Sequence, residues 1–335
     1  MRVIFLYNKT SSHPTVFQPK VIEAMKQVVP NLDEKVYTYA DLLADPTGFS
    51  DVDMLFSTWG MPALKEEELE SILPNLKCVF YAAGSVQGFA RPFLNRGIKV
   101  ISAWAANAVP VAEYSTAQII LANKGFFGLS RLLSHKNLNE AHKTKHSYPG
   151  NFKEKIGLLG CGMIGSHVAE LLQQYALEVL VFDPFISDEK AERLKVKKCS
   201  LEEIFSTCSV ISNHLASNKE TKGMLRYEHF SLMRPYSTFI NTGRGAQVIE
   251  ADLVRVLKER PDVSALLDVT DPEPSPLDHP FYDLPNCFLT PHIAGNIIAN
   301  EQARMAEYML NEYKCFMAGE PCKYEVTKEM LLTMA

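Results

Sequence analysis

Apolar residues along this chain recur with two spacings, and the two spacings alternate from the first residues onward. Short runs of β-type residues, separated by stretches with helical periodicity, predict strands that alternate with helices. In the N-terminal third these runs are Val3–Leu6, Lys35–Tyr39, Met54–Phe56, Cys78–Tyr81 and Lys99–Ile101. Such alternation is typical of a parallel sheet with helices on its faces. We therefore expect one doubly wound α/β unit to end near residue 102.

The same alternation resumes in the second half of the chain. Its predicted strands are Lys155–Leu159, Val179–Phe182, Val210–Ser212, Thr238–Asn241, Ala265–Val269 and Phe288–Thr290. Between the two series, Val109 to about Leu133 is hydrophobic on all sides, which predicts one long helix buried between domains or subunits. Residues 299–317 predict a C-terminal helix. The pattern as a whole predicts an α/β protein with two doubly wound parallel sheets.

A glycine fingerprint lies near the middle of the chain, in the sequence Gly160-Cys161-Gly162-Met163-Ile164-Gly165. It stands between a predicted strand and a predicted helix, which is the context that a dinucleotide-binding turn requires. The first glycine permits the turn, the second admits a pyrophosphate, and the third lets helix and strand pack closely. We interpret Cys161 as a small filler residue. Asp183 ends the next predicted strand, where a carboxylate binds ribose hydroxyls and repels a 2′-phosphate, so we predict NAD rather than NADP.

Three polar residues stand at or beyond the ends of later strands, where ligands of open α/β sheets bind. Arg244 carries a planar guanidinium that suits bidentate recognition of a carboxylate. His292 follows the last predicted strand, and Glu273 lies in a loop of five prolines between residues 271 and 286. A carboxylate bonded to one ring nitrogen would fix the histidine tautomer and stabilise its protonated form.

Each of these residues also has an ordinary interpretation. An arginine after a strand is more often a surface or ion-pair residue, and spacing alone assigns no role to a single histidine or glutamate. His214 also ends a strand, and a structural hydrogen bond explains it as well as catalysis does. His279 lies in the proline-rich loop, where we expect a solvated side chain.

Length, net charge and cysteine content limit the classes of protein to which this chain can belong. At 335 residues the chain exceeds the usual size of one core, which predicts two domains. The net charge of -5 provides no electrostatic footprint for nucleic acid or an anionic membrane. The seven cysteines are scattered without a CxxC pair, and no run resembles a signal peptide or a membrane span. We predict a cytoplasmic protein with reduced thiols, no metal and a small-molecule partner.

The ordered motifs resemble those of the D-isomer-specific 2-hydroxyacid dehydrogenase family from about Asp51 to Asn296. They are the glycine fingerprint, Asp183-Pro184, Val210–His214 with Glu220-Thr221, Asn241–Gly245 with Val248, Leu267–Val269 with Glu273-Pro274, and Thr290–Gly295. The resemblance implies hydride transfer between NAD and C2 of a 2-oxo acid. It implies Arg244 as the carboxylate ligand, His292 as the acid/base, and Glu273 as the partner of His292.

The resemblance also implies an architecture and a set of binding residues. A Rossmann coenzyme domain, residues 104–296, would be inserted into a flavodoxin-like substrate domain, residues 1–103 with 297–335. Family members form homodimers through the coenzyme domain, near the long apolar helix. The implied cofactor-binding residues are Gly160, Gly162, Met163, Ile164, Gly165, Asp183, His214, Ala216, Thr221, Thr242, Asp268 and Gly295, and the implied substrate-binding residues are Gly84, Ser85 and Val86 with Arg244.

The chain departs from the family pattern at three loops. Residues 84–89 read GSVQGF where many members have a further glycine and an aspartate, and His214-Leu215-Ala216 lacks the proline of His-Ala-Pro. Residues 57–60 read STWG, without the arginine that binders of phosphorylated acids commonly carry there. With the expected lack of a regulatory domain, this argues against 3-phosphoglycerate. Trp59 and Trp104 fit an apolar pocket or the core equally well. The main alternative function is a non-catalytic NAD(H)-sensing protein, as among the family's corepressor relatives.

Overall fold

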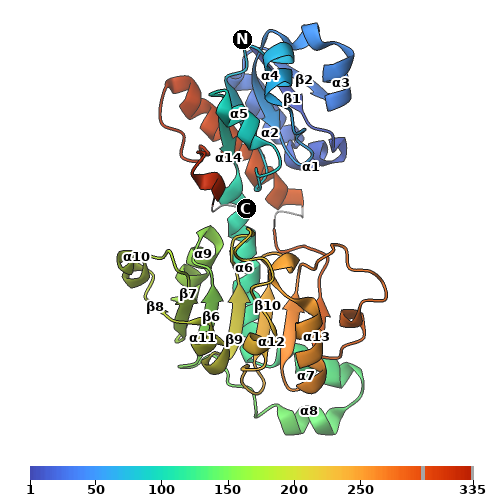
Figure 1. Ribbon diagram of the computed structural model, residues 1–335, viewed down its shortest axis with the longest axis vertical. Helices are drawn as coiled ribbons and strands as arrows, with labels where there is room; N and C mark the ends of the chain where they lie inside the picture. Colours follow the sequence, from blue (N-terminus) through green and yellow to red (C-terminus); the bar gives the residue numbers. More distant parts are fainter. Residues whose placement is uncertain (296–298, 333–335) are drawn as a thin grey trace. The chain divides into compact units, whose positions relative to one another are not determined.

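The chain divides into two compact units in the computed structural model, which describes residues 1–295 and 299–332 (Figure 1). The N-terminal unit comprises Met1–Asn107 with Asn296–Ala335, and the central unit comprises Ala108–Gly295. The first boundary lies slightly beyond residue 103, where the sequence analysis places it, and falls inside helix α6. The other expected boundary, between residues 296 and 297, lies outside the described residues.

The N-terminal unit contains a parallel sheet in the order β2-β1-β3-β4-β5, which is the flavodoxin-like order. Its strands are β1 (Arg2–Leu6), β2 (Leu32–Tyr37), β3 (Val52–Ser57), β4 (Cys78–Tyr81) and β5 (Lys99–Ser102). Its helices are α1 (His13–Val16), α2 (Pro19–Val28), α3 (Tyr39–Ala44), α4 (Glu66–Ile72), α5 (Ala90–Asn95) and α14 (Ala299–Ala318), with 3₁₀ turns at Thr10–Ser12, Pro46–Phe49 and Met330–Leu332.

The last helix of the chain completes the core of this unit. In Figure 1 α14, coloured red, lies among the blue and teal elements of the N-terminal unit. Met305, Met309 and Tyr313 of α14 are buried in the same apolar cluster as the strands of the sheet. Beyond α14 the chain covers the edge strand β5, since the amide of Val326 donates to the carbonyl of Val100 at 2.8 Å. Residues distant in sequence therefore build one core.

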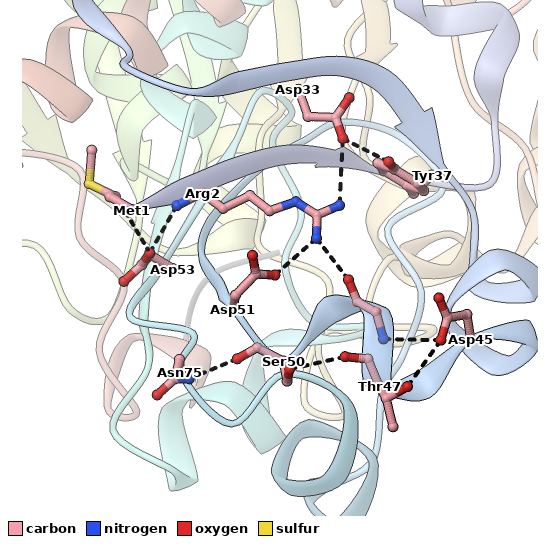
Figure 2. Close-up of polar contacts among 11 residues, drawn as sticks. Met1, Arg2, Asp33, Tyr37, Asp45, Thr47, Ser50, Asp51, Asp53 and Asn75 are labelled. Atoms are coloured by element: carbon pink, nitrogen blue, oxygen red, sulfur yellow. Dashed lines mark hydrogen bonds and ion pairs between the residues drawn. The ribbon is translucent and has the colours of Figure 1, made fainter.

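Arg2 ties together the amino-terminal ends of three strands of this sheet (Figure 2). Its Nη1 donates to the carbonyl of Gly48 at 2.7 Å and to Asp51 Oδ1 at 2.9 Å. Its Nη2 lies 3.6 Å from Asp33 Oδ2, and its backbone amide donates to Asp53 Oδ2 at 2.9 Å. Because ligands of open α/β sheets bind at the opposite, carboxyl edge, this cluster has a structural role.

The central unit contains a second parallel sheet, in the order β12-β11-β10-β9-β6-β7-β8. Its strands are β6 (Lys155–Leu159), β7 (Glu178–Phe182), β8 (Val196–Lys198), β9 (Val210–Asn213), β10 (Thr238–Asn241), β11 (Ser264–Leu267) and β12 (Cys287–Leu289). Its helices are α6 (Trp104–Asn123, which begins in the N-terminal unit), α7 (Phe126–Ser134), α8 (Leu138–Thr144), α9 (Met163–Leu172), α10 (Asp188–Arg193), α11 (Leu201–Thr207), α12 (Tyr227–Phe230) and α13 (Glu250–Glu259), with 3₁₀ turns at Gly245–Gln247 and Pro280–Tyr282. Counted in chain order, the strands β6 to β11 have the Rossmann arrangement.

The prediction of one long helix over Val109–Leu133 is wrong. Helix α6 ends at Asn123 and α7 begins at Phe126. Gly125 between them has a φ of 69°, a left-handed conformation that glycine adopts without the penalty of a side chain. A Cβ at Gly125 would lie 2.4 Å from the ring of Tyr148. Because the apolar run continues through this turn, hydrophobicity alone conceals the break.

Within the described part of the chain, no helix has the length and apolar character needed to cross a membrane. In that same part, no three His, Cys, Asp or Glu side chains are grouped so that they could hold a metal ion. All seven cysteines are free thiols.

Candidate active site

The predicted site residues of the central unit all follow carboxyl ends of its strands. Parallel strands bring these ends to one edge of the sheet, where ligands bind in open α/β folds. The residues that follow each strand are Gly160 to Gly165 after β6, Asp183 after β7, His214, Ala216 and Thr221 after β9, Thr242 and Arg244 after β10, Asp268 and Glu273 after β11, and His292 and Gly295 after β12. This edge is the candidate site.

The three glycines of the fingerprint meet three different steric demands. Gly160 has a φ of 88°, and a Cβ there would lie 2.7 Å from the carbonyl oxygen of His214. A Cβ at Gly165 would lie 2.0 Å from the carbonyl oxygen of Gly160. Gly162 has nothing within 4 Å of a built Cβ, and it precedes α9 without offering a side-chain cap. The unpaired amides of the first turn of α9 therefore face open space, which suits an anionic ligand.

Asp183 and Lys190 hold this turn from outside. Asp183 Oδ2 accepts a hydrogen bond from the amide of Cys161 at 2.6 Å, and Lys190 Nζ donates to the carbonyl of Cys161 at 2.6 Å. Each carboxylate oxygen keeps a further lone pair, so Asp183 can still accept from a ribose hydroxyl. Burial raises the pKa of the Cys161 thiol, and the side chain is 1 % exposed, as expected of a filler residue.

His214 is a buried, neutral imidazole held by hydroxyl groups. Its Nε2 lies 2.9 Å from Ser212 Oγ, and its Nδ1 lies 3.4 Å from Thr242 Oγ1. Burial lowers the pKa of His214 to about 3. The structural interpretation of His214 therefore fits its side chain. Nearby, Thr221 Oγ1 donates to the carbonyl of Ala216 at 2.6 Å and closes the loop after β9.

Asp268 holds the segment that carries His292. Its Oδ1 accepts from the amide of Ile293 at 2.9 Å and from Thr290 Oγ1 at 2.6 Å, and its Oδ2 accepts from the amide of Ala294 at 2.9 Å. The amide of His292 donates to the carbonyl of Asp268 at 3.0 Å. His292 has a φ of 53°, which is uncommon for a residue other than glycine and is found at functional sites.

The side chains of His292 and Glu273 form a hydrogen bond of 2.5 Å between Nδ1 and Oε1. Because an ionised carboxylate only accepts hydrogen bonds, Nδ1 carries the hydrogen. The other ring nitrogen, Nε2, is then the one that can exchange a proton with a ligand. This is the geometry expected of a histidine that acts as an acid and base.

Arg244 lies in the electrostatic field of the same pair. Its Nη1 donates to the carbonyl of Gly243 at 2.8 Å, which leaves the guanidinium with several other donors. Burial lowers the pKa of Arg244, and the charge of Glu273 opposes that shift. A cation with so little hydration binds a carboxylate strongly. The structure thus brings Arg244, Glu273 and His292 to one part of the sheet edge.

The central unit matches a known family over most of its length. The family model described as "D-isomer specific 2-hydroxyacid dehydrogenase, NAD binding domain" matches residues 117–294, which is more than half of the chain. The chain belongs to the D-isomer specific 2-hydroxyacid dehydrogenase family. The resemblance inferred from the motifs is therefore confirmed, as are the two-sheet α/β fold and NAD as the cofactor. The open side of Gly162 and the free start of α9 fit the phosphates of that cofactor.

Curated relatives and solved structures share this fold. The D-3-phosphoglycerate dehydrogenases of Bacillus subtilis and Archaeoglobus fulgidus are each 29% identical, over 260 and 255 residues, which cover 76% and 72% of this chain and 48% and 47% of theirs. The chain thus spans about half the length of these relatives. The apo form of D-mandelate dehydrogenase from Rhodotorula graminis is 17% identical, with a TM-score of 0.81 and 98% coverage of both chains. TT0316 from Thermus thermophilus is 23% identical, with a TM-score of 0.71, and covers 98% of this chain and 100% of its own.

Gln247, which no sequence pattern singles out, cross-links the turn that carries Arg244 to the loop after β9. Its Oε1 accepts from the amide of Arg244 at 3.2 Å and from Asn213 Nδ2 at 2.7 Å. Its Nε2 donates to the carbonyls of Leu215 at 2.7 Å and Ala216 at 3.1 Å. The side chain is fully buried. No spacing rule points to Gln247, because three of its four partners, Asn213, Leu215 and Ala216, belong to β9 and the loop after it.

The expectation that His279 is solvated is wrong. Its Nε2 lies 3.2 Å from Glu250 Oε2, and the two side chains are only 19% and 12% exposed. Glu250 is the first residue of α13 and was also missed by the sequence analysis. The pairing joins two segments of the family's coenzyme domain that are far apart in sequence.

The predicted substrate residues lie at the carboxyl edge of the other sheet, in the N-terminal unit. They follow β4, and Ser102 Oγ fixes their turn by donating to the carbonyl of Gly84 at 2.8 Å. Val86 is buried while Ser85 is exposed. Among the described residues, the amides of Gly84, Ser85 and Val86 have no acceptor. They therefore remain free to donate to an anionic group.

Both tryptophans pack within the N-terminal unit. Trp59 is partly buried against its apolar core, and Trp104 meets the ring of Tyr324 edge-on at 5.8 Å. Of the two interpretations of these residues, the core role is the one that these contacts support.

Proposed function

We propose that this chain is an NAD-dependent oxidoreductase that interconverts a D-2-hydroxy acid and its 2-oxo acid. The observation that carries the proposal is the hydrogen bond between His292 Nδ1 and Glu273 Oε1, beside the partly desolvated Arg244. When bound, NAD supplies or accepts the hydride at C2 of the acid. The protein must then bind the acid, orient it and move one proton.

Arg244 is the proposed ligand of the substrate carboxylate. Its planar guanidinium can form two parallel hydrogen bonds with a carboxylate, which fixes the orientation of the acid as well as its position. The same cation lowers the energy of negative charge that develops on the carbonyl oxygen during reduction. We also propose the free amides of Gly84, Ser85 and Val86 as donors to an acid's carboxylate.

His292 is the proposed acid and base. In the reduction direction the protonated imidazole donates from Nε2 to the developing alkoxide, and in oxidation neutral Nε2 accepts that proton. Glu273 holds the Nδ1 hydrogen throughout, so the ring keeps one orientation. Asp268 supports this arrangement by fixing the backbone around His292.

The substrate is proposed only as a class. The relatives named D-3-phosphoglycerate dehydrogenase act on a phosphorylated acid by their names, whereas residues 57–60 of this chain contain no arginine. This loop favours an acid without a phosphate group.

We further propose that two copies of the chain pair through α7. None of the residues of α7 is buried, although most are apolar. Phe126 and Leu133 are each 51% exposed. Apolar residues gathered on an unburied helix are typical of protein interfaces. A second copy of the chain can cover its own α7, as in a two-fold symmetric interface.

The test is NADH oxidation with a panel of 2-oxo acids, including glyoxylate, hydroxypyruvate, pyruvate and branched or aromatic acids. We expect turnover with at least one acid, and a loss of ~10²–10⁴-fold in kcat for His292→Gln, the range for removal of a general acid. NADH affinity, measured by fluorescence, should be unchanged. The exposed His146 provides a control, since His146→Gln should keep full activity.

Two outcomes would contradict this proposal. Full activity of His292→Gln would remove His292 from the mechanism. Tight NADH binding without turnover of any acid would instead support the alternative, a non-catalytic protein that senses NAD(H).

A further inference from the structure

Glu250 contacts the proline-rich loop at two points, one on each side of Glu273. Its Oε1 accepts a hydrogen bond from the amide of Asp271 at 2.9 Å. Its Oε2 lies 3.2 Å from His279 Nε2. Glu250 is the first residue of helix α13. Glu273 lies in the loop, between the two residues that Glu250 contacts. One carboxylate therefore closes residues 271–279 into a loop.

The contact with His279 is anchored in the apolar core. His279 Nδ1 accepts a hydrogen bond from the amide of Phe281 at 3.3 Å, so the hydrogen of the neutral ring is on Nε2, the atom that lies 3.2 Å from Glu250 Oε2. The imidazole also packs on the ring of Phe281, with centroids 4.5 Å apart. Phe281 is 1% exposed and belongs to a buried cluster of the central unit. His279 thus gives the loop a fixed point on the body of the unit.

The start of the loop is also tied to the turn that carries Arg244. A Cβ at Gly245 would lie 2.1 Å from the carbonyl carbon of Thr270 and 2.5 Å from the amide nitrogen of Asp271. The two backbones therefore touch, and only glycine allows it. A shift of the loop at Asp271 would disturb the residue next to Arg244 as well as Glu273.

Stability alone does not account for a carboxylate at this position. The side chain of Glu250 is 12% exposed, and burial raises the pKa of its carboxyl above the usual value despite the Asp271 amide and His279. Burial therefore penalises the charged form of Glu250 more than the Asp271 amide and His279 favour it. Replacement of a whole buried ion pair by apolar residues of similar volume is often neutral for stability.

We propose that Glu250 is a positioning residue for the reaction, which through Asp271 and His279 holds the loop so that Glu273 remains hydrogen-bonded to His292. Glu250 touches neither the reacting atoms nor the cofactor in this role. The inference rests on the proposed function of the His292–Glu273 pair. It goes beyond that function by assigning a residue of α13 to hold the His292–Glu273 pair in place.

The test compares Glu250→Ala and Glu250→Gln with substitutions at Glu259. Glu259 ends the same helix and also binds two partners, accepting from Arg255 Nε at 2.8 Å and from Tyr227 Oη at 2.8 Å. We expect Glu250→Ala to lower kcat by up to ~10²-fold, the effect of a misplaced catalytic group. Glu250→Gln keeps the acceptor for Asp271 but places an amide against His279, so its kcat should be intermediate. Both variants should bind NADH with wild-type affinity, and Glu259→Gln should keep wild-type kcat.

A spectroscopic measurement separates this inference from the proposed function. The short bond between His292 and Glu273 should produce a far-downfield proton resonance for Nδ1–H, identified by its loss in Glu273→Gln. We expect Glu250→Ala to abolish or shift this resonance and Glu259→Gln to preserve it. If wild-type protein reduces no acid but the resonance responds in this way, the function fails and the positioning role stands. If Glu250→Ala keeps both the resonance and kcat while only its melting temperature falls, Glu250 is merely structural and the inference is wrong.

Discussion

Three polar side chains at the carboxyl edge of the central sheet, those of Asp268, Gln247 and His214, are buried, and each exchanges water for fixed protein partners. Asp268 is 3% exposed and accepts from two amides and a hydroxyl. Gln247 is fully buried with both ends of its amide bonded, and His214 is buried between two hydroxyls. Removing one partner leaves a buried group without a hydrogen bond, which costs about 1–3 kcal/mol. Substitutions here should affect folding as well as activity, and the two effects must be measured separately.

His214 should make the protein sensitive to mild acid. Its folded pKa is about 3, whereas an unfolded histidine titrates at its usual value of 6.5. Only the unfolded chain takes up this proton as the pH falls below the unfolded value, so the free energy of unfolding decreases. The expected loss is about 2 kcal/mol by pH 5. Urea denaturation at pH 7 and pH 5 should show this loss in the wild type. In His214→Gln the decrease in the free energy of unfolding over the same pH range should be smaller by about 2 kcal/mol. Equal losses in both proteins would show that His214 is not held neutral.

Single residues also mark the limit of what the sequence predicts. Arg244, Glu273 and His292 could be selected because each one follows a strand or lies in a stiff loop, and local sequence shows that. Glu250 and Gln247 could not, since their function depends on partners that follow other strands. His279 was misjudged for the same reason. A polar residue in a loop is solvated unless residues distant in sequence pack against it, and the spacing of residues in the sequence does not show which ones do.

In the turn from β6 to α9, glycine is needed for two different reasons. A side chain at Gly165 would collide with the backbone of Gly160, whereas one at Gly162 would meet nothing in the protein. Gly165 is therefore required by the fold. Gly162 is required by the ligand that approaches the start of α9.

Gly162→Ala should fold like the wild type but bind NADH weakly. Its methyl group would occupy the space of a phosphate, and one lost hydrogen bond to a charged group is worth about 1.5–3 kcal/mol, which is at least about tenfold in Kd. Gly165→Ala should instead lower the melting temperature, because its Cβ would lie 2.0 Å from a carbonyl oxygen. Fluorescence titration with NADH and thermal melts test both variants. Wild-type affinity in Gly162→Ala would place the phosphates elsewhere.

Strands were easier to predict than helix ends. Buried parallel strands form continuous apolar runs, and β4, β6 and β10 have the bounds that their runs indicate. Strand β8 was missed because its three residues, Val196–Lys198, are half-buried or exposed and include two lysines. The break between α6 and α7 depends on the backbone of Gly125, and an apolar run on both sides hides it.

At the scale of the whole molecule, the unburied helix α7 predicts a change of oligomeric state on substitution. Phe126→Glu together with Leu133→Glu should convert the proposed dimer to a monomer, because a buried interface does not accept two unpaired carboxylates. Sedimentation velocity measures this directly. Leu232→Glu is a suitable control, since Leu232 is an exposed apolar residue elsewhere in the central unit. A monomeric wild type, or a dimer that survives both substitutions, would contradict pairing through α7.

The position of α14 determines the order in which the two units can complete their cores during synthesis. The central unit is one continuous stretch, Ala108–Gly295, so all of its strands have been synthesised before α14 begins. The N-terminal unit is started first, yet Met305, Met309 and Tyr313 of its core belong to that last helix. Domains fold as units during synthesis. The central unit is therefore synthesised in full while the N-terminal unit still exposes the apolar strands that α14 will cover. We expect a chaperone to bind the nascent chain most strongly in this period.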